Sequence, residues 1–147
     1  MELKTLTKEL CHPAAEIEKL YLSTNWSENQ LCDIVENENY KYIVCLINGE
    51  AVGVGGAICT SPYSCEIFTV AVKEENRGLG IGKAIVDALI QFCKEKQGES
   101  IFLEVEETNQ SAIKLYEKCG FVSVGIRRGF YKGKNAIIME KPLKNGN

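Results

Sequence analysis

The chain has 147 residues and a formal net charge of −3, and 45% of its residues are hydrophobic while 25% are charged. This composition is typical of a folded domain and excludes an extended disordered chain. The length predicts a single domain over residues 1–147, with a frayed tail from about residue 143 onward. The slight acidic excess argues against a nucleic-acid partner, because such proteins usually carry a basic stripe.

The sequence carries no sign of a membrane or secretory segment. No run approaches the roughly 18 apolar residues that a membrane span needs. The N-terminal MELKTLTKEL lacks the basic start and apolar core of a signal peptide. We therefore expect no membrane partner and a cytoplasmic location.

The seven cysteines suggest a disulfide framework or a metal site, but their spacing argues against both. They form no C-x-x-C pair, and His12 is the only histidine. Because zinc ligands come in closely spaced pairs, we expect no metal. Most of the cysteines lie in apolar runs such as IVCLI, GAICT and IQFCK, where a thiol is a small buried hydrophobic group. Their odd number fits free thiols in a reducing compartment.

The N-terminal half predicts two short helices and a hairpin after a first strand at ELKTLT. A helix is expected over HPAAEIEKLYLST, with Pro13 in its tolerant first turn, and a second helix is expected to begin at Ser27. Ser27 and Gln30 have the spacing of a capping box. The long apolar stretch that follows predicts two strands about Asn48–Gly49, a strong hairpin signal.

The second half alternates strands with helices. SCEIFTVAVK is apolar enough for a central strand, and the apolar periodicity after it predicts a helix over 80–97 that Gly98 ends. SIFLEVEE, FVSVGIRR and NAIIMEKPL predict further strands, with a helix at NQSAIKLYEKCG. The whole pattern predicts an α/β (α+β) fold, a mixed and mostly antiparallel sheet with helices on both faces.

The stretch EENRGLGIGKA, residues 74–84, does not fit the common phosphate-binding motifs. A dinucleotide fingerprint needs glycine where Lys83 stands. A P-loop needs glycine where Arg77 stands and a hydroxyl residue where Ala84 stands. Both interpretations fail at residues that their mechanisms require.

The same stretch nevertheless favours an anion at the start of the helix. Helix N-terminal amides lack partners, and positions 78–82 offer no Ser, Thr or Asp to cap them. Arg77 and Lys83 place positive charge where the helix dipole disfavours cations, which makes sense if an anion lies between them. The alternative is a glycine turn with basic side chains in solvent.

The glycine-rich stretch and the segments around it resemble a known family. Arg77-x-x-Gly80-x-Gly82 matches the [QR]-x-x-G-x-[GA] signature of the GNAT superfamily of N-acetyltransferases. Within that superfamily, IFTVAVKEENRGLGIGKAIVDALI, IFLEVEETNQSAIKLYEKCGFVSVGIRRGFY and NAIIME are similar to the RimI-type ribosomal-protein N-terminal acetyltransferases. The detailed match covers roughly residues 60–141, and NWSE resembles an early Trp-Ser segment of that group.

The resemblance implies a GNAT fold and acetyl-CoA as co-substrate. It implies that strand backbone groups around Val70 and Val72 hold the pantetheine arm and polarise the acetyl carbonyl, while the loop amides hold the pyrophosphate. Asn109 matches an asparagine that contacts the coenzyme, and it is equally suited to cap a helix. The expected coenzyme-binding residues are Val70, Ala71, Val72, Arg77, Gly78, Leu79, Gly80, Ile81, Gly82, Lys83 and Asn109.

Two residues are candidates for catalysis. Strand alternation places Glu104 on one face with Phe102 and Glu106, where a partly desolvated carboxylate can act as a base or simply lie in solvent. Tyr116 lies on the apolar stripe of its helix, as a core aromatic would, yet a phenol with a pKa near 10 suits protonation of a thiolate. The resemblance assigns Glu104 as general base and Tyr116 as general acid.

The acceptor is less well defined. Trp26, Arg128 and Tyr131, together with Arg127, are candidates for acceptor binding, and Asn135 departs from the aspartate common before AIIM. The resemblance implies direct acetyl transfer to an amine, most simply the N-terminal α-amine of a ribosomal or other protein. The alternatives are a small-molecule amine or lysine acetyltransferase, and a non-catalytic CoA-binding regulatory module.

Overall fold

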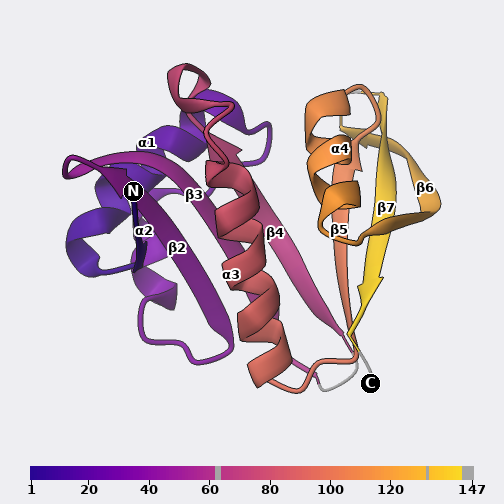
Figure 1. The fold of residues 1–147 in the computed structure, drawn as a ribbon, viewed down its shortest axis with the longest axis horizontal. Coiled ribbons are helices and arrows are strands. Elements are labelled where there is room, and N and C mark those ends of the chain that lie inside the picture. The colour runs from indigo at the N-terminus through magenta and orange to yellow at the C-terminus, as the bar shows by residue number, and fades with distance from the viewer. Residues whose placement is uncertain (62–63, 132, 144–147) are drawn as a thin grey trace.

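One sheet organises the chain in a computed structural model that describes residues 1–61, 64–131 and 133–143, without the side chains of Phe130 and Tyr131. Within this part the strand order is β1-β2-β3-β4-β5-β7-β6 (Figure 1). All pairings are antiparallel except that of β4 with β5. The strands are β1 (Glu2–Thr5), β2 (Tyr40–Ile47), β3 (Glu50–Cys59), β4 (Cys65–Val72), β5 (Ser100–Glu106), β6 (Val122–Tyr131) and β7 (Lys134–Pro142).

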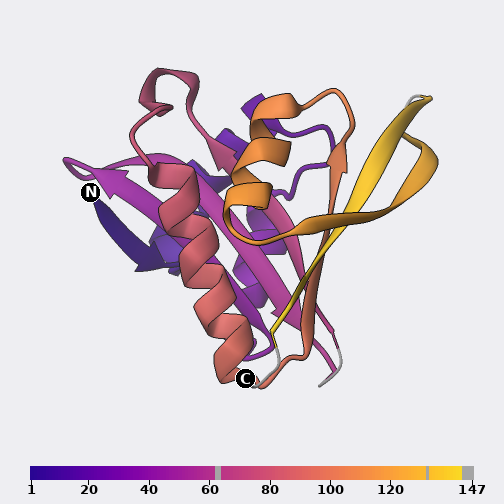
Figure 2. The same ribbon diagram turned by 45° about the vertical axis from the view of Figure 1, so that its right-hand side comes forward.

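Helices cover both faces of the sheet, as the sequence predicts. One core lies under α3 and α4, and a second lies under α1 and α2. Figures 1 and 2 show α3 and α4 side by side on the near face, while the β6–β7 hairpin projects away from the rest. The helices are α1 (Cys11–Tyr21), α2 (Glu28–Ile34), α3 (Ile81–Glu95) and α4 (Gln110–Lys118), and none among the described residues is long and apolar enough to cross a membrane.

The local signals in the sequence have the expected effects, with one exception. Ser27 and Gln30 form the capping box of α2, and the β2–β3 turn has Asn48 at φ 53° and Gly49 at φ 80°. The prediction that α3 extends to residue 97 and that Gly98 ends it is wrong. The helix ends at Glu95, and Gln97 takes the left-handed conformation at φ 62°.

The sheet forks between β4 and β5. These parallel strands pair only at Cys65–Ile101 and Glu66–Phe102, and then they diverge, as the widening gap in Figure 1 shows. Among the described residues, β4 therefore has no ladder partner on its β5 side from Ile67 onward. This leaves backbone donors and acceptors available to a bound molecule.

A bulge in β4 determines which side chains face which layer. The β3–β4 register shifts after Gly56–Thr69, so that Phe68 is the extra residue. Beyond the bulge, Ala71 packs in the core under α1, whereas Val70 and Val72 pack toward α3.

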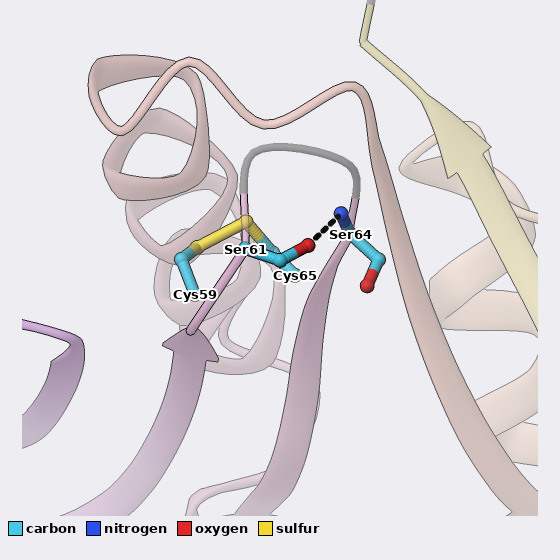
Figure 3. The surroundings of a disulfide bond; sticks show 4 residues. All are labelled: Cys59, Ser61, Ser64 and Cys65. Carbon is cyan, nitrogen blue, oxygen red and sulfur yellow. Dashed lines mark hydrogen bonds between the residues drawn. A yellow bond between two sulfur atoms is a disulfide. The ribbon is translucent and has the colours of Figure 1, made fainter.

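The expectation that every cysteine is a free thiol is wrong. Cys59 and Cys65 are directly opposite each other on β3 and β4 and form a disulfide, with Cα atoms 4.3 Å apart (Figure 3). The sulfur of Cys93 belongs to the same buried group, in which the sulfur atoms lie within 4.8 Å of one another. The argument from free thiols to a reducing compartment loses its basis here. The five free cysteines are Cys11, Cys32, Cys45, Cys93 and Cys119.

Leu143, the last described residue, is fixed by contacts with the rest of the fold. The backbone N–H of Leu143 donates to the Glu99 carbonyl at 2.8 Å, and its side chain packs against the core under α3. The expected frayed tail therefore does not include Leu143, and its remaining residues, 144–147, lie outside the described part.

Candidate active site

A cleft of about 640 Å³ opens where β4 diverges from β5, between the N-terminus of α3 and the helix α4. All of the expected coenzyme-binding residues line it except Leu79, whose side chain is exposed. Tyr116 lines the same cleft. The fold thus brings together three segments that lie far apart in the sequence: 70–72, 77–83 and 109–118.

The N-terminus of α3 has free amides that face this cleft. Gly80 is the N-cap at φ 81°, and no side chain caps the helix. A Cβ atom at Gly80, or at Gly78 with φ 82°, would meet nothing within 4 Å, so a bulky group has room to approach the backbone. The combination of free amides, helix dipole and open backbone fits the pyrophosphate of a coenzyme.

Gly82 has a different reason to be glycine. A Cβ atom there would lie 3.1 Å from Cδ2 of Leu115, on α4. The small residue therefore lets the first turn of α3 lie close to α4, which narrows the cleft beside Tyr116.

The side chains of Arg77 and Lys83 both have protein partners. Arg77 Nε donates to the Val72 carbonyl at 3.1 Å, and its guanidinium lies 5.3 Å from the ring centroid of Tyr21. Lys83 pairs with Asp87 at 2.7 Å, and this hydrogen bond raises the pKa of the lysine.

Lys114 and Lys118 are cleft residues that sequence reasoning missed. They lie four residues apart on α4, on either side of Tyr116, so both extend toward the same side of that helix. A helical projection of KLYEK could have revealed them. With Arg77 and Lys83 they make a cationic cleft, and no acidic residue of the described chain lines it.

Tyr116 combines the two roles considered for it. It is only 7% exposed and packs edge-on against Phe121, with ring centroids 6.0 Å apart, yet it also lines the cleft. Burial raises its pKa above the usual tyrosine value, and Cys119 adds to the effect. Like any tyrosine hydroxyl it is protonated at neutral pH, so it can serve as a proton donor.

Glu104 lies on the opposite face of the fork. Its neighbours Leu103 and Val105 belong to the core under α3, so its own side chain faces away from that core. The side chain is 28% exposed, and Arg127 Nη1 donates to both carboxylate oxygens, at 3.0 and 3.1 Å. Arg127, proposed as an acceptor-binding residue, thus orients the candidate base.

The other expected acceptor residues have mixed outcomes. The Trp26 ring stacks on Phe68 with centroids 4.8 Å apart and meets Tyr40 edge-on. Arg128 is exposed on β6, and the side chain of Tyr131 lies outside the described residues. Asn135, the departure noted in the sequence, accepts a hydrogen bond from the Gly129 N–H at 3.1 Å and so closes the β6–β7 hairpin.

A buried carboxylate supports the aromatic group around Trp26. Glu18, fully buried on α1, accepts hydrogen bonds from the Trp26 N–H at 2.8 Å and the Tyr42 hydroxyl at 2.5 Å. Burial raises the pKa of Glu18, while these two bonds lower it. Sequence reasoning missed this residue because a glutamate on an amphipathic helix ordinarily faces solvent.

Asn109 has the two functions that the sequence left open. Its side chain caps α4 by accepting a hydrogen bond from the Ala112 N–H at 3.2 Å, and the residue also lines the cleft.

Comparison with known proteins agrees with this geometry. The model of the Acetyltransferase (GNAT) family matches residues 4–121. A [ribosomal protein bS18]-alanine N-acetyltransferase of Haemophilus influenzae is 34% identical over 130 residues, which cover 84% of this chain and 86% of that protein. The N-alpha-acetyltransferase RimI of Mycobacterium tuberculosis is 32% identical over 105 residues, covering 68% of this chain and 65% of that one.

A solved structure shows the same arrangement. The crystal structure of the ribosomal-protein-S18-alanine N-acetyltransferase from Escherichia coli superposes with a TM-score of 0.86 at 27% identity. The match covers 99% of this chain and 96% of that chain.

Proposed function

Because the chain belongs to the GNAT family of acetyltransferases, we propose that it acetylates the N-terminal α-amine of a protein, with a ribosomal protein as the first candidate. As a family member it is an acetyl-CoA-dependent acyltransferase. The observation that carries the proposal is the cleft itself, in which the free amides of α3 and the buried hydroxyl of Tyr116 meet the open edge of β4.

The residues of the cleft would hold acetyl-CoA by its pantetheine arm and by its pyrophosphate. When bound, acetyl-CoA supplies an acetyl group activated as a thioester. The amides at the start of α3 would bind the pyrophosphate, and the open edge of β4 at 70–72 would pair with the pantetheine arm. A β4 N–H directed at the acetyl oxygen would stabilise the negative charge that develops there.

In this proposal Glu104 and Tyr116 move protons on opposite sides of the fork. Glu104, oriented by Arg127, accepts a proton from the acceptor amine. Tyr116, whose hydroxyl is protonated at neutral pH, donates a proton to the departing thiolate.

Among the candidate acceptors, an N-terminal α-amine is the easiest for this site to deprotonate. An α-amine with a pKa near 8 is partly neutral at physiological pH, whereas lysine with a pKa near 10.4 is almost wholly charged. The names of the relatives point to the same acceptor class.

A three-acceptor panel tests the acceptor class. CoA thiol release is measured with a basic peptide that starts with alanine, with the same peptide N-terminally blocked but carrying one internal lysine, and with a free polyamine. We expect the first peptide to be at least ten times better in kcat/KM than the others. Preference for the lysine peptide or the polyamine would contradict the proposal.

A further inference from the structure

Glu66 shares the face of the sheet that carries Glu104. It is the last residue of β4 that pairs with β5, opposite Phe102. Its neighbours Cys65 and Ile67 pack in the core under α3, so the Glu66 side chain lies on the other face. Glu104 follows Phe102 by two residues and lies on that same face. The two carboxylates therefore lie on adjacent strands at the base of the fork.

The carboxylates of this face differ in their partners. Glu104 is held by Arg127, and Glu106 accepts a hydrogen bond from Ser23 and lies 3.8 Å from Lys134 Nζ. Across the described residues, Glu66 has neither a hydrogen bond nor an ion pair from its side chain. The charged groups on the neighbouring strands of this face are Glu104 and Glu106 on β5, Arg127 on β6, and Lys134 and Glu140 on β7. Glu140 lies opposite Phe102 and accepts a hydrogen bond from the Ser100 hydroxyl at 2.7 Å.

The surroundings of Glu66 favour binding of a positive charge. Partial burial raises its pKa, and the negative charge of Glu104 raises it further. A cation placed between the two carboxylates would relieve both effects, because it would neutralise the repulsion and replace lost solvation.

The reaction itself needs more than one proton acceptor. An amine that arrives as an ammonium loses two protons when it becomes a secondary amide. The C–N bond forms and the C–S bond breaks without oxidation or reduction. One of the two protons ends on the thiol of CoA and the other is released to solvent. A single carboxylate such as Glu104 can accept only one proton at a time.

We propose that Glu66 is a second catalytic carboxylate, which binds the ammonium of the acceptor and takes its first proton before Glu104 takes the second. This inference rests on the proposed acetyl transfer to an amine. Glu66 then passes its proton to solvent, to which its side chain is open. The negative, unpaired Glu66 selects the ammonium form of the acceptor, and the Arg127-bound Glu104 acts on the neutral amine.

Charge-removing variants separate the two carboxylates through their pH profiles. Values of kcat/KM for the alanine peptide are measured from pH 6 to 9 for wild type, Glu66→Gln, Glu104→Gln and Glu106→Gln. Without Glu66 the enzyme must capture amine already neutral in solution, whose fraction rises about tenfold per pH unit below its pKa near 8. We expect Glu66→Gln to be about 100-fold slower than wild type at pH 6 and within about threefold at pH 8.5.

The controls make the result specific. Glu104→Gln is expected to stay at least 100-fold slower across the whole range, and Glu106→Gln to stay within about threefold of wild type. Glu66→Asp, which keeps the charge, should recover most of the low-pH activity. Thermal melts and CoA titrations of each variant show whether it is folded.

The outcomes distinguish this inference from the proposed function. A Glu66→Gln deficit that is absent at pH 6, or that does not change with pH, would overturn the role of Glu66 and leave N-terminal acetylation intact. Transfer to lysine or polyamine alone would overturn the proposed acceptor class. The pH series of wild type and Glu66→Gln, repeated with that amine, would still test the role of Glu66. Absence of transfer to every amine would overturn both.

Discussion

On the α3–α4 side of the fork, the cleft is lined by basic side chains and by no acidic one of the described chain. The opposite face of the sheet, by contrast, carries carboxylates on β4 and β5. The net charge of −3 is a sum over the whole chain, so it reveals neither the basic region nor the acidic one. The basic side chains are Arg77, Lys83, Lys114 and Lys118, and the carboxylates proposed to act on the acceptor are Glu66 and Glu104.

This difference explains how one small domain can serve two substrates of opposite charge. In the proposed reaction a phosphate-rich coenzyme would be attracted to one side and a cationic amine to the other, and the diverging strands leave an opening between them. In the proposed mechanism the acetyl thioester and the acceptor amine would meet at this opening and react directly.

Loss of the Tyr116 hydroxyl should have the largest effect, because it removes the proposed proton donor to the CoA thiolate. We expect Tyr116→Phe to lower kcat by 100-fold or more while the affinity for CoA changes by less than about threefold. Stopped-flow thiol release and calorimetric CoA titration measure the two quantities. Tyr21→Phe is the matched control in the same cleft, where the Tyr21 hydroxyl accepts a hydrogen bond from the Glu74 N–H. Equal kcat for Tyr116→Phe and wild type would remove Tyr116 from the mechanism.

Features set by near neighbours in the sequence could be predicted, and those set by the fold could not. The capping box of Ser27 and Gln30 is predictable from the sequence, because the contact spans one helical turn. Cys59 and Cys65 gave no such sign, because their spacing matches no metal or redox motif and only the hairpin brings them together. The buried Glu18 is a similar case, since its partners come from other elements.

The candidate site divides along the same line. The glycine loop was recognisable because consecutive residues form it, so its place beside the cleft was expected. The Arg127–Glu104 pair joins β6 to β5 across 23 residues of sequence, and no local pattern indicates it. The placement of Glu66 beside Glu104 likewise depends on the parallel register of β4 and β5.

The disulfide lies at the base of the fork, where the two sides meet. Its loss should lower the stability of the fold without changing the charge on either side of the fork. Closing a loop of this length is worth about 2 kcal/mol in the free energy of unfolding. Urea unfolding of Cys59→Ser should show a loss of that size, while Cys32→Ser should show a much smaller one. Under denaturing conditions without reductant, thiol titration should find five thiols, and with reductant seven. Seven thiols in both conditions would refute the disulfide.

Glycines with the same backbone conformation can separate strain from coenzyme binding. Gly80 at the cleft and Gly49 in the β2–β3 turn have φ values of 81° and 80°, and a Cβ atom at either would meet nothing within 4 Å. Alanine at each should therefore cost a similar amount, about 1–2 kcal/mol in the free energy of unfolding. Only Gly80→Ala should also weaken CoA binding, because its methyl group would face the free amides of α3. Equal CoA affinities for the two variants would place the pyrophosphate elsewhere.

The smallest expected effect concerns the charges themselves. Lys118→Gln should weaken CoA binding about two- to fivefold at low salt, because exposed charge pairs are worth roughly 0.2–1 kcal/mol. Lys94→Gln, an exposed lysine of α3 outside the cleft, should leave the affinity unchanged. Added salt should weaken CoA binding in the wild type and narrow the Lys118→Gln difference, because it screens the attraction. It should also raise the KM of a cationic peptide, since opposite charges attract on both sides of the fork. If added salt changed only the CoA affinity or only the peptide KM, the substrate whose binding did not respond would be held by contacts other than charge.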